Sequence, residues 1–256
     1  MDIQEDNRAQ AKAAFSLLLI CSAISLALWF LPYVGFLTYP FRIFVTLIHE
    51  TGHALASWLT FGQVNRIELD WSGNGVTWTN GGVRLLISSA GYLGATAYGA
   101  GLLLLLRRAR MARIAAFSSA AVLLAITIFL GGNLTVWVAG MFFGLGLLGL
   151  SLVKSQRFVH FFMSFLAVQC VMNALFDLRT LIYLSAFEPS RHTDAQNMAA
   201  ATNQIIPAAV WAIGWAAVSF AILAFTLVIY YRGLRAQPAP AALLPLANTA
   251  AKQASA

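Results

Sequence analysis

Long apolar runs constrain the fold of this chain more than any other feature of its sequence. They recur along most of its length, and an apolar run of 18 or more residues is typical of a helix that crosses a bilayer. Hydrophobic residues make up 60% of the chain and charged residues only 10%, whereas a soluble globular chain has roughly half and a quarter. The sequence therefore predicts an integral membrane protein.

Seven stretches have the length and composition of transmembrane helices. They are residues 14–37, 40–61, 82–106, 112–130, 134–153, 158–186 and 207–231. The sixth stretch is long for one crossing, so we expect its end to project from the membrane or to break. We interpret residues 1–235 as one polytopic membrane domain and the Ala- and Pro-rich segment 236–256 as a disordered tail.

A short segment between the second and third predicted spans has the pattern of strands. In "GQVNRIELDWSGNGVTWTN" apolar and polar residues alternate, and "SGNG" supplies the residues of a turn. We predict a β-hairpin at residues 64–79, the only strong strand signal in the chain. Because a two-stranded ribbon is marginal alone, we expect it to lie against the membrane surface or the helices. The predicted fold is thus all-α, with about seven transmembrane helices and one small membrane-associated β-hairpin.

The basic residues gather in short clusters that flank apolar runs. "RRARMAR" at 107–113 follows the third predicted span, Lys154 and Arg157 lie around the end of the fifth, and Arg232 and Arg235 follow the seventh. By the positive-inside rule these clusters mark the cytoplasmic side, and seven crossings then place the N-terminus on the opposite side. Since no basic face results, the net charge of +7 does not indicate a nucleic-acid partner.

The stretch "TLIHETGHALASW" at 46–58 places three titratable groups in the second apolar run. His49 and His53 are four residues apart, so on a helix both imidazoles can reach one metal ion. In this HExxH arrangement Glu50 can accept a proton from the water that attacks a peptide carbonyl and pass it to the leaving nitrogen. A chance match is expected in about one such chain in a thousand. Ionisable residues at membrane depth usually mark a function, which favours a catalytic zinc site over ordinary interhelical hydrogen bonds.

A catalytic zinc ion usually takes three protein ligands, so a further residue must complete the site. Asp177 lies well inside the sixth predicted span and is the first candidate, with an ion pair to Arg179 as the ordinary alternative. Asn173, one helical turn earlier, can hydrogen-bond the ligand or the substrate. Asp194 is the alternative ligand, although a helix cap explains it equally well. His160 and His192 are weaker candidates, the first at the membrane interface and the second in a polar loop.

The third predicted span carries small residues at Gly91, Gly94, Gly99 and Gly101. Small residues let membrane helices approach closely, so we expect this face to pack against another helix. Direct contact with substrate is the alternative.

The chain resembles the site-2 protease class of intramembrane metalloproteases, the M50 family. The resemblance rests on four features: the HExxH motif "HETGH" in a span, the hairpin after it, the small-residue helix and an aspartate in a later span. The chain is similar to its M50B-like branch in particular, over most of residues 40–231. The resemblance implies zinc ligation by His49 and His53, with Glu50 as general base. The family's third ligand is an aspartate in an LDG motif after an Asn-Pro stretch. "NALFDLRTL" keeps the Asn and Asp177 but lacks the Pro and Gly, so Asp194 stays open.

The resemblance implies a zinc-dependent endopeptidase that cuts membrane-spanning protein substrates, often in regulated proteolysis, with the hairpin presenting an extended substrate by strand pairing. We expect it in a lipid bilayer, in a bacterial cytoplasmic (inner) membrane. The competing hypothesis is a membrane scaffold without protease activity, or an ion or solute carrier that uses the same polar cluster. An intact Glu50 favours the protease.

Overall fold

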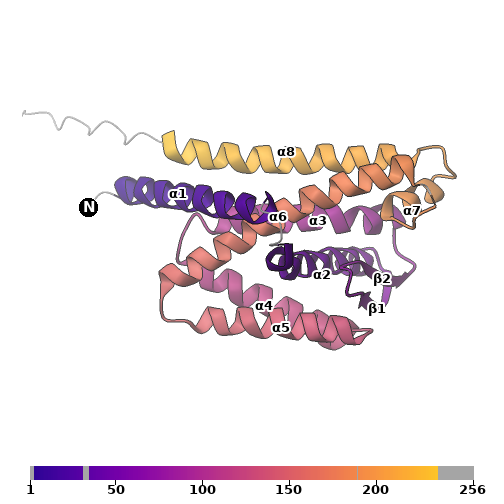
Figure 1. Ribbon diagram of the computed structural model, residues 1–256, viewed down its shortest axis with the longest axis horizontal. Coiled ribbons are helices and arrows are strands. Elements are labelled where there is room, and N and C mark those ends of the chain that lie inside the picture. Colours follow the sequence, from indigo (N-terminus) through magenta and orange to yellow (C-terminus); the bar gives the residue numbers. More distant parts are fainter. Residues whose placement is uncertain (1–2, 31–34, 189, 236–256) are drawn as a thin grey trace, which may run out of the picture.

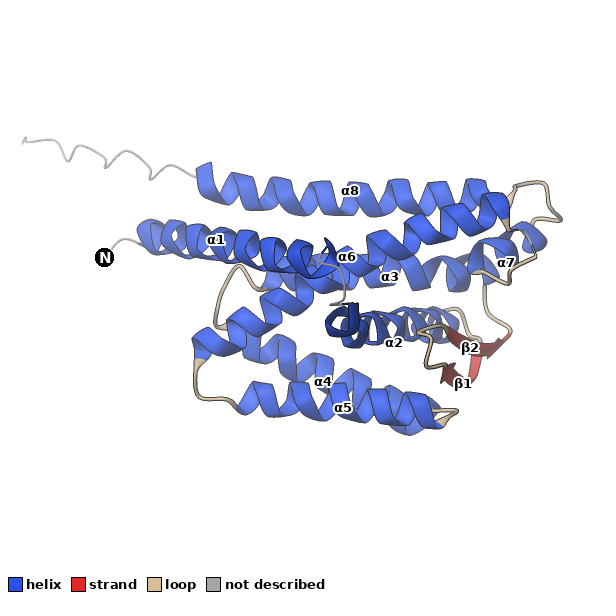
Figure 2. Cartoon of the chain, viewed as in Figure 1, coloured by secondary structure: helices blue, strands red, loops and turns tan. Residues whose placement is uncertain are grey.

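The computed structural model describes residues 3–30, 35–188 and 190–235, so the predicted tail 236–256 lies outside the described residues. This part of the chain forms eight helices and two strands (Figures 1 and 2). The elements are α1 (Ile3–Phe30), α2 (Gly35–Leu59), β1 (Gln63–Leu69), β2 (Gly75–Asn80), α3 (Arg84–Leu105), α4 (Met111–Leu130), α5 (Leu134–Leu152), α6 (Gln156–Phe187), α7 (Asp194–Ala201) and α8 (Ala208–Arg235). The predicted all-α architecture with one small hairpin is confirmed.

Four of the described helices are long and apolar enough to cross a membrane, and the predicted number of seven is not confirmed. The four spans are Met111–Leu130, Leu134–Leu152, Gln156–Phe187 and Ala208–Arg232. Helix α2 is different because it carries the polar HExxH residues. It packs against α1, α3, α5 and α6, and Figure 1 shows it in the middle of the bundle. A helix enclosed by other helices does not need an apolar surface all around.

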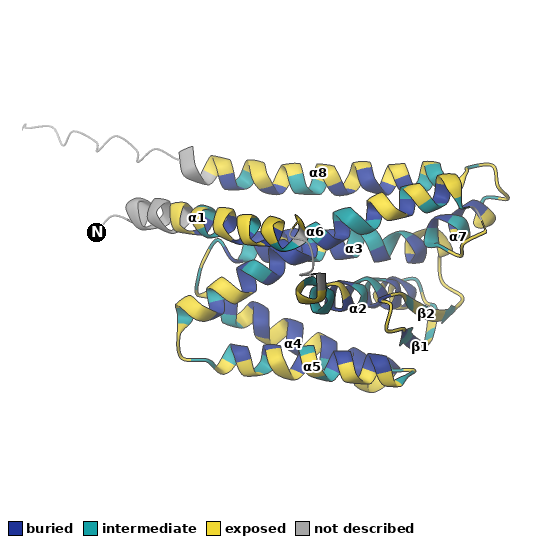
Figure 3. Cartoon of the chain, viewed as in Figure 1, coloured by how far each residue is buried: buried dark blue, intermediate teal, exposed yellow. Residues whose placement is uncertain are grey.

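The outward faces of the long helices are apolar. Figure 3 shows exposed positions along the outer sides of α5 and α8. They include large hydrophobic side chains such as Phe129 on α4, Phe142 on α5 and Phe225 on α8, which are 78%, 68% and 64% exposed. A soluble monomer rarely exposes apolar surface of this extent, whereas lipid covers it at no cost. The protein is therefore an integral membrane protein.

One boundary of the predicted helices is wrong. The sequence predicts a first span that ends at residue 37 and a second that begins at residue 40, but α2 begins at Gly35 and contains Pro40 in its second turn. Pro40 has no N–H to pair with the carbonyl of Phe36, so α2 continues past it with one backbone hydrogen bond fewer. Helix α6 runs without a break for 32 residues. Its length of ~48 Å, at 1.5 Å per residue, exceeds a hydrocarbon core of ~30 Å, so its end extends toward α7.

The predicted hairpin is confirmed as an antiparallel pair with the register Ile67↔Thr77 and a bulge between Val64 and Arg66. Ile67 and Leu69 are buried beneath it. The ribbon is fixed to the α4–α5 connection, because Asn133 Nδ2 donates to Leu69 O at 2.7 Å and Gly132 N donates to Ile67 O at 2.8 Å. These contacts supply the support that two strands alone lack. They place the hairpin at the end of the bundle where α2 ends.

Candidate metal centre

Helix α2 brings the three HExxH side chains to one place. His49 Nε2 and His53 Nε2 are 3.0 Å apart, as expected for residues one helical turn apart on one face. Ligand atoms of His49, Glu50 and His53 lie within 4.8 Å of one another, so these three residues could hold a metal ion. His49 is partly buried, and Glu50 and His53 are buried. The local geometry predicted for this motif is therefore present.

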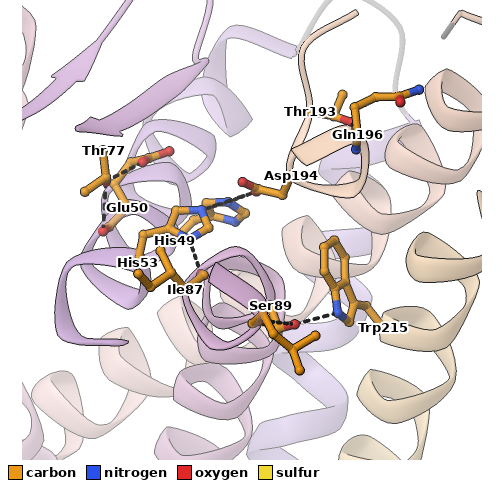
Figure 4. Close-up of polar contacts among 11 residues, drawn as sticks. His49, Glu50, His53, Thr77, Ile87, Ser89, Thr193, Asp194, Gln196 and Trp215 are labelled. Carbon is orange, nitrogen blue, oxygen red and sulfur yellow. Dashed lines mark hydrogen bonds and ion pairs between the residues drawn. The ribbon is translucent and has the colours of Figure 1, made fainter. Parts of the chain in front are cut away.

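Asp194 is the carboxylate that meets the two histidines. Its Oδ2 atom lies 3.2 Å from His49 Nε2 and 3.2 Å from His53 Nε2, and Figure 4 shows its side chain pointing from α7 toward them. The side chain of Thr193, and not that of Asp194, caps α7, since Thr193 Oγ1 accepts a hydrogen bond from Gln196 N at 3.2 Å. Capping by its neighbour leaves the Asp194 carboxylate free for the histidines.

Asp177 lies near the histidines without contacting them. It is partly buried on α6 and interacts electrostatically with His49 and Arg42. Among the described residues, no hydrogen bond or ion pair joins it to His49 or His53, and none joins it to Arg179. Of the two predicted carboxylates, the structure thus brings the alternative candidate to the site.

The remaining predicted residues form no hydrogen bonds with the cluster in the described structure. Asn173 is buried on α6, where its Nδ2 donates to Gln169 O at 2.8 Å within the same helix. His160 donates from Nε2 to Leu106 O at 2.7 Å, at the end of α3. His192 is exposed, as expected for a residue in a polar loop. None of these three hydrogen-bonds His49 or His53 in the described structure.

The donor set fits a zinc ion. His53 Nδ1 donates to Ile87 O at 2.6 Å, so in the neutral ring that a metal requires the Nε2 lone pair would face His49 and Asp194. Two imidazole nitrogens and a carboxylate oxygen thus converge at 3.0 to 3.2 Å, a spacing that shared protons or a bound metal cation can maintain. Tetrahedral zinc with bonds of ~2.1 Å holds its ligand atoms about 3.4 Å apart. The observed spacing is close to that value.

The electrostatics of Asp194 agree with a ligand role. Burial raises the pKa of this carboxyl, but the attraction of His53 and hydrogen bonds from both histidines outweigh burial and lower the pKa below its ordinary value. Asp194 is therefore ionised at neutral pH, as a metal ligand must be.

The hairpin fixes Glu50. Thr77, on β2, donates from Oγ1 to Glu50 Oε2 at 2.6 Å, and Figure 4 shows the two side chains together. A Cβ atom added to Gly75 would lie 2.5 Å from Glu50 Oε1, so only glycine lets β2 pass this close. The motif alone did not predict Thr77 and Gly75. The position of the hairpin directly after HExxH was the signal that could have found them.

Helix α3 lies directly against the histidines. A Cβ atom at Gly91 would come within 3.0 Å of both rings, and one at Gly52 would come within 3.0 Å of the Ala90 carbonyl oxygen. Gly91 and Gly94 of α3 therefore pack against α2 and Gly99 packs against α6, which confirms packing for three of the four predicted glycines, whereas a Cβ atom at Gly101 would meet nothing. Beside it, the Tyr92 ring stands edge-on to His49 with ring centres 4.5 Å apart and stacks on Trp215. Trp215 donates to Ser89 Oγ at 3.0 Å.

Comparison with known proteins agrees with this geometry. No curated protein and no solved structure matches the chain. A family model described as Peptidase M50B-like matches residues 18–226, a range that contains α2, the hairpin and Asp194. The chain belongs to the Peptidase M50B-like family.

Proposed function

We propose that this protein is a zinc-dependent intramembrane endopeptidase that hydrolyses peptide bonds of membrane-spanning substrates, in regulated proteolysis. The observation that carries the proposal is the convergence of His49, His53 and Asp194 beside the buried carboxylate of Glu50. Membership of a peptidase family supports the same reaction class. We place the protein in a bacterial cytoplasmic membrane.

His49, His53 and Asp194 would hold the zinc ion. When bound, zinc supplies a Lewis acid that polarises the scissile carbonyl and lowers the pKa of water toward neutrality. The side chains of His49 and Asp194 keep 15% and 20% of their surface exposed, so water can reach this cluster. Ile87 fixes the orientation of the His53 ring through its carbonyl.

Glu50 is the proposed general base. It accepts a proton from the attacking water and then donates that proton to the amide nitrogen that leaves. The hydroxyl of Thr77 occupies Glu50 Oε2, which leaves Oε1 as the basic atom and restricts the rotation of the carboxylate. A helical substrate hides its carbonyls in its own hydrogen bonds, so it must unwind before it can react, and strand pairing along the hairpin would stabilise the extended form.

Zinc content and peptide cleavage test this proposal together. We would purify the protein in detergent and measure zinc per chain and cleavage of a membrane-spanning peptide, in the unmodified protein and in His49→Ala and Glu50→Gln. About one zinc ion per chain is expected, as for single catalytic sites. His49→Ala should lose both zinc and cleavage, whereas Glu50→Gln should keep zinc and lose cleavage.

Two outcomes would contradict the proposal. Absence of zinc from every preparation, even after reconstitution with zinc, would remove the metal site. Full cleavage by Glu50→Gln would remove the general base. A scaffold or carrier predicts no peptide cleavage by the zinc-loaded protein, so a negative cleavage result with bound zinc would favour that class.

A further inference from the structure

The two ends of the helix bundle differ in charge. At one end lie the α3–α4 connection, the α5–α6 connection and the end of α8 (Figure 1). These segments are tied together, since Arg113 Nη2 donates to Val153 O at 2.9 Å and the guanidinium of Arg107 lies 5.7 Å from the centre of the Tyr230 ring. The connections and the end of α8 at this basic end carry eight basic residues and no acidic residue, namely Arg107, Arg108, Arg110, Arg113, Lys154, Arg157, Arg232 and Arg235. The start of α1, which also lies here, adds two acidic and two basic residues and therefore no net charge.

The other end, which we call the site end, holds the hairpin, the α4–α5 connection and α7 (Figure 1). Five arginines lie in the elements on this side, at Arg42, Arg66, Arg84, Arg179 and Arg191. Two of them form ion pairs, Arg66 with Glu68 at 2.9 Å and Arg191 with Glu188 at 3.3 Å. All acidic residues after the first six positions also belong to this side. Its connections are therefore much less basic.

Tryptophan marks the site end as a membrane interface. Trp58, at the end of α2, and Trp71 and Trp78, in the hairpin, are 45%, 61% and 47% exposed. Trp137, at the start of α5, is 40% exposed, and Trp211 lies at the start of α8. Tryptophan is enriched where the hydrocarbon core meets water. The metal cluster thus lies near one surface of the bilayer and not at its centre.

The direction of the N-terminal helix indicates that the described chain passes between the two ends of the bundle an even number of times. Figure 1 shows α1 beginning at the basic end and α2 ending at the hairpin, while α8 returns to the basic end. Both ends of the described chain are thus on the basic side. Seven crossings, as expected from the sequence, would separate them.

We propose that the site end faces away from the cytoplasm, so that the metal centre takes its substrates from the extracytoplasmic side. Lysine and arginine in short connections are retained on the cytoplasmic side, and the α3–α4 and α5–α6 connections with their flanking residues carry six of the eight basic residues named above. The substrate class rests on the proposed function: membrane proteins cut close to the extracytoplasmic end of a spanning segment. The orientation itself rests only on the charges and the fold.

Cysteine labelling tests the orientation without any need for activity. Both native cysteines, Cys21 and Cys170, are buried, at 0% and 1% exposure, so little background is expected. Ser72, in the hairpin turn, and Ser155, in the α5–α6 connection, are both exposed and form a matched pair. We would express Ser72→Cys and Ser155→Cys in bacterial cells, prepare spheroplasts and add a membrane-impermeant maleimide before and after permeabilisation.

Ser72→Cys should be labelled in intact spheroplasts to the same extent as after permeabilisation, and Ser155→Cys at least ~10-fold less in intact than in permeabilised spheroplasts. The opposite pattern, or equal labelling of both in intact spheroplasts, would overturn the proposal. If Ser72→Cys is not labelled even after permeabilisation, Asn80→Cys, exposed at the end of β2, replaces it with the same expectations. A reversed orientation would leave the proposed protease reaction intact, and a protein without zinc or cleavage would still report its orientation.

Discussion

Helices α6 and α7 each offer a carboxylate to the two histidines, and only the shorter helix delivers it. Asp177 lies within the 32 residues of α6, and Asp194 is the first residue of the eight-residue α7. Asp194 Oδ2 is 3.2 Å from both Nε2 atoms, whereas Asp177 has only an electrostatic interaction with His49. Depth in an apolar run is therefore a poor guide to which carboxylate contacts the histidines. A polar connection that folds back over the bundle can reach the same site.

The largest expected effect separates the two carboxylates directly. Asp194→Asn should reduce zinc affinity by more than the ~10- to 100-fold that loss of an outer hydrogen-bond partner costs, because it removes a charged ligand. Asp177→Asn, the matched control, should keep about one zinc ion per chain. Zinc titration of the metal-free variants measures both. Loss of zinc only in Asp177→Asn would return the third ligand to α6.

The second prediction concerns Gly91 on α3. It tests whether the histidines can hold their positions only because this residue has no side chain. Helix α3 packs against both α2 and α7, and Gly91 touches the two rings. Gly91→Ala should introduce a clash that costs about 1–3 kcal/mol. If the clash displaces the two histidine rings, zinc affinity should drop roughly 10- to 100-fold.

Gly94→Ala is the matched control for Gly91→Ala. A Cβ atom there would meet Gly52 Cα at 3.6 Å, an ordinary contact, so zinc affinity should stay within about twofold of the unmodified protein. Equal losses in the two variants would show that α3 tolerates no added methyl group anywhere and that Gly91 has no special relation to the site.

The third effect concerns the hairpin, which acts on Glu50 as α7 acts on the histidines. Thr77→Val should remove the hydroxyl that holds Glu50 Oε2. We expect kcat to fall about tenfold, which corresponds to an activation free energy higher by ~1.4 kcal/mol, with zinc content unchanged. Thr79→Val, two residues further along β2, is the control. A loss of zinc in Thr77→Val would mean that the hairpin positions the ligands and not the base.

The fold followed from the sequence wherever one segment determined its own structure. Four long apolar helices, the hairpin and the one-turn spacing of His49 and His53 are local patterns, and these are confirmed. The contact of Asp194 with the histidines joins residues 145 positions apart, so no local periodicity encodes it. Spacing along a helix placed Asp177 in the membrane but gave no information on how α7 folds back. The predicted number of seven spans is not confirmed. For α2, which carries the HExxH residues, the surroundings depend on the neighbouring helices, and its own sequence does not give them.

The smallest expected effect compares the N-caps of the same two helices. Thr193 Oγ1 accepts from Gln196 N at the start of α7, and Ser155 Oγ accepts from Phe158 N at the start of α6. Replacement of either hydroxyl by Ala should destabilise its helix by about 1 kcal/mol. In α7 the next residue is Asp194, so Thr193→Ala should loosen the ligand and weaken zinc binding about fivefold. In α6 the cap lies at the opposite end of the bundle, so Ser155→Ala should leave zinc affinity unchanged.

Thr193→Ser, which keeps a hydroxyl, should bind zinc as the unmodified protein does. If Thr193→Ala binds zinc normally, the packing of α7 on α3, α6 and α8 is sufficient to hold it, and the position of Asp194 does not depend on the cap.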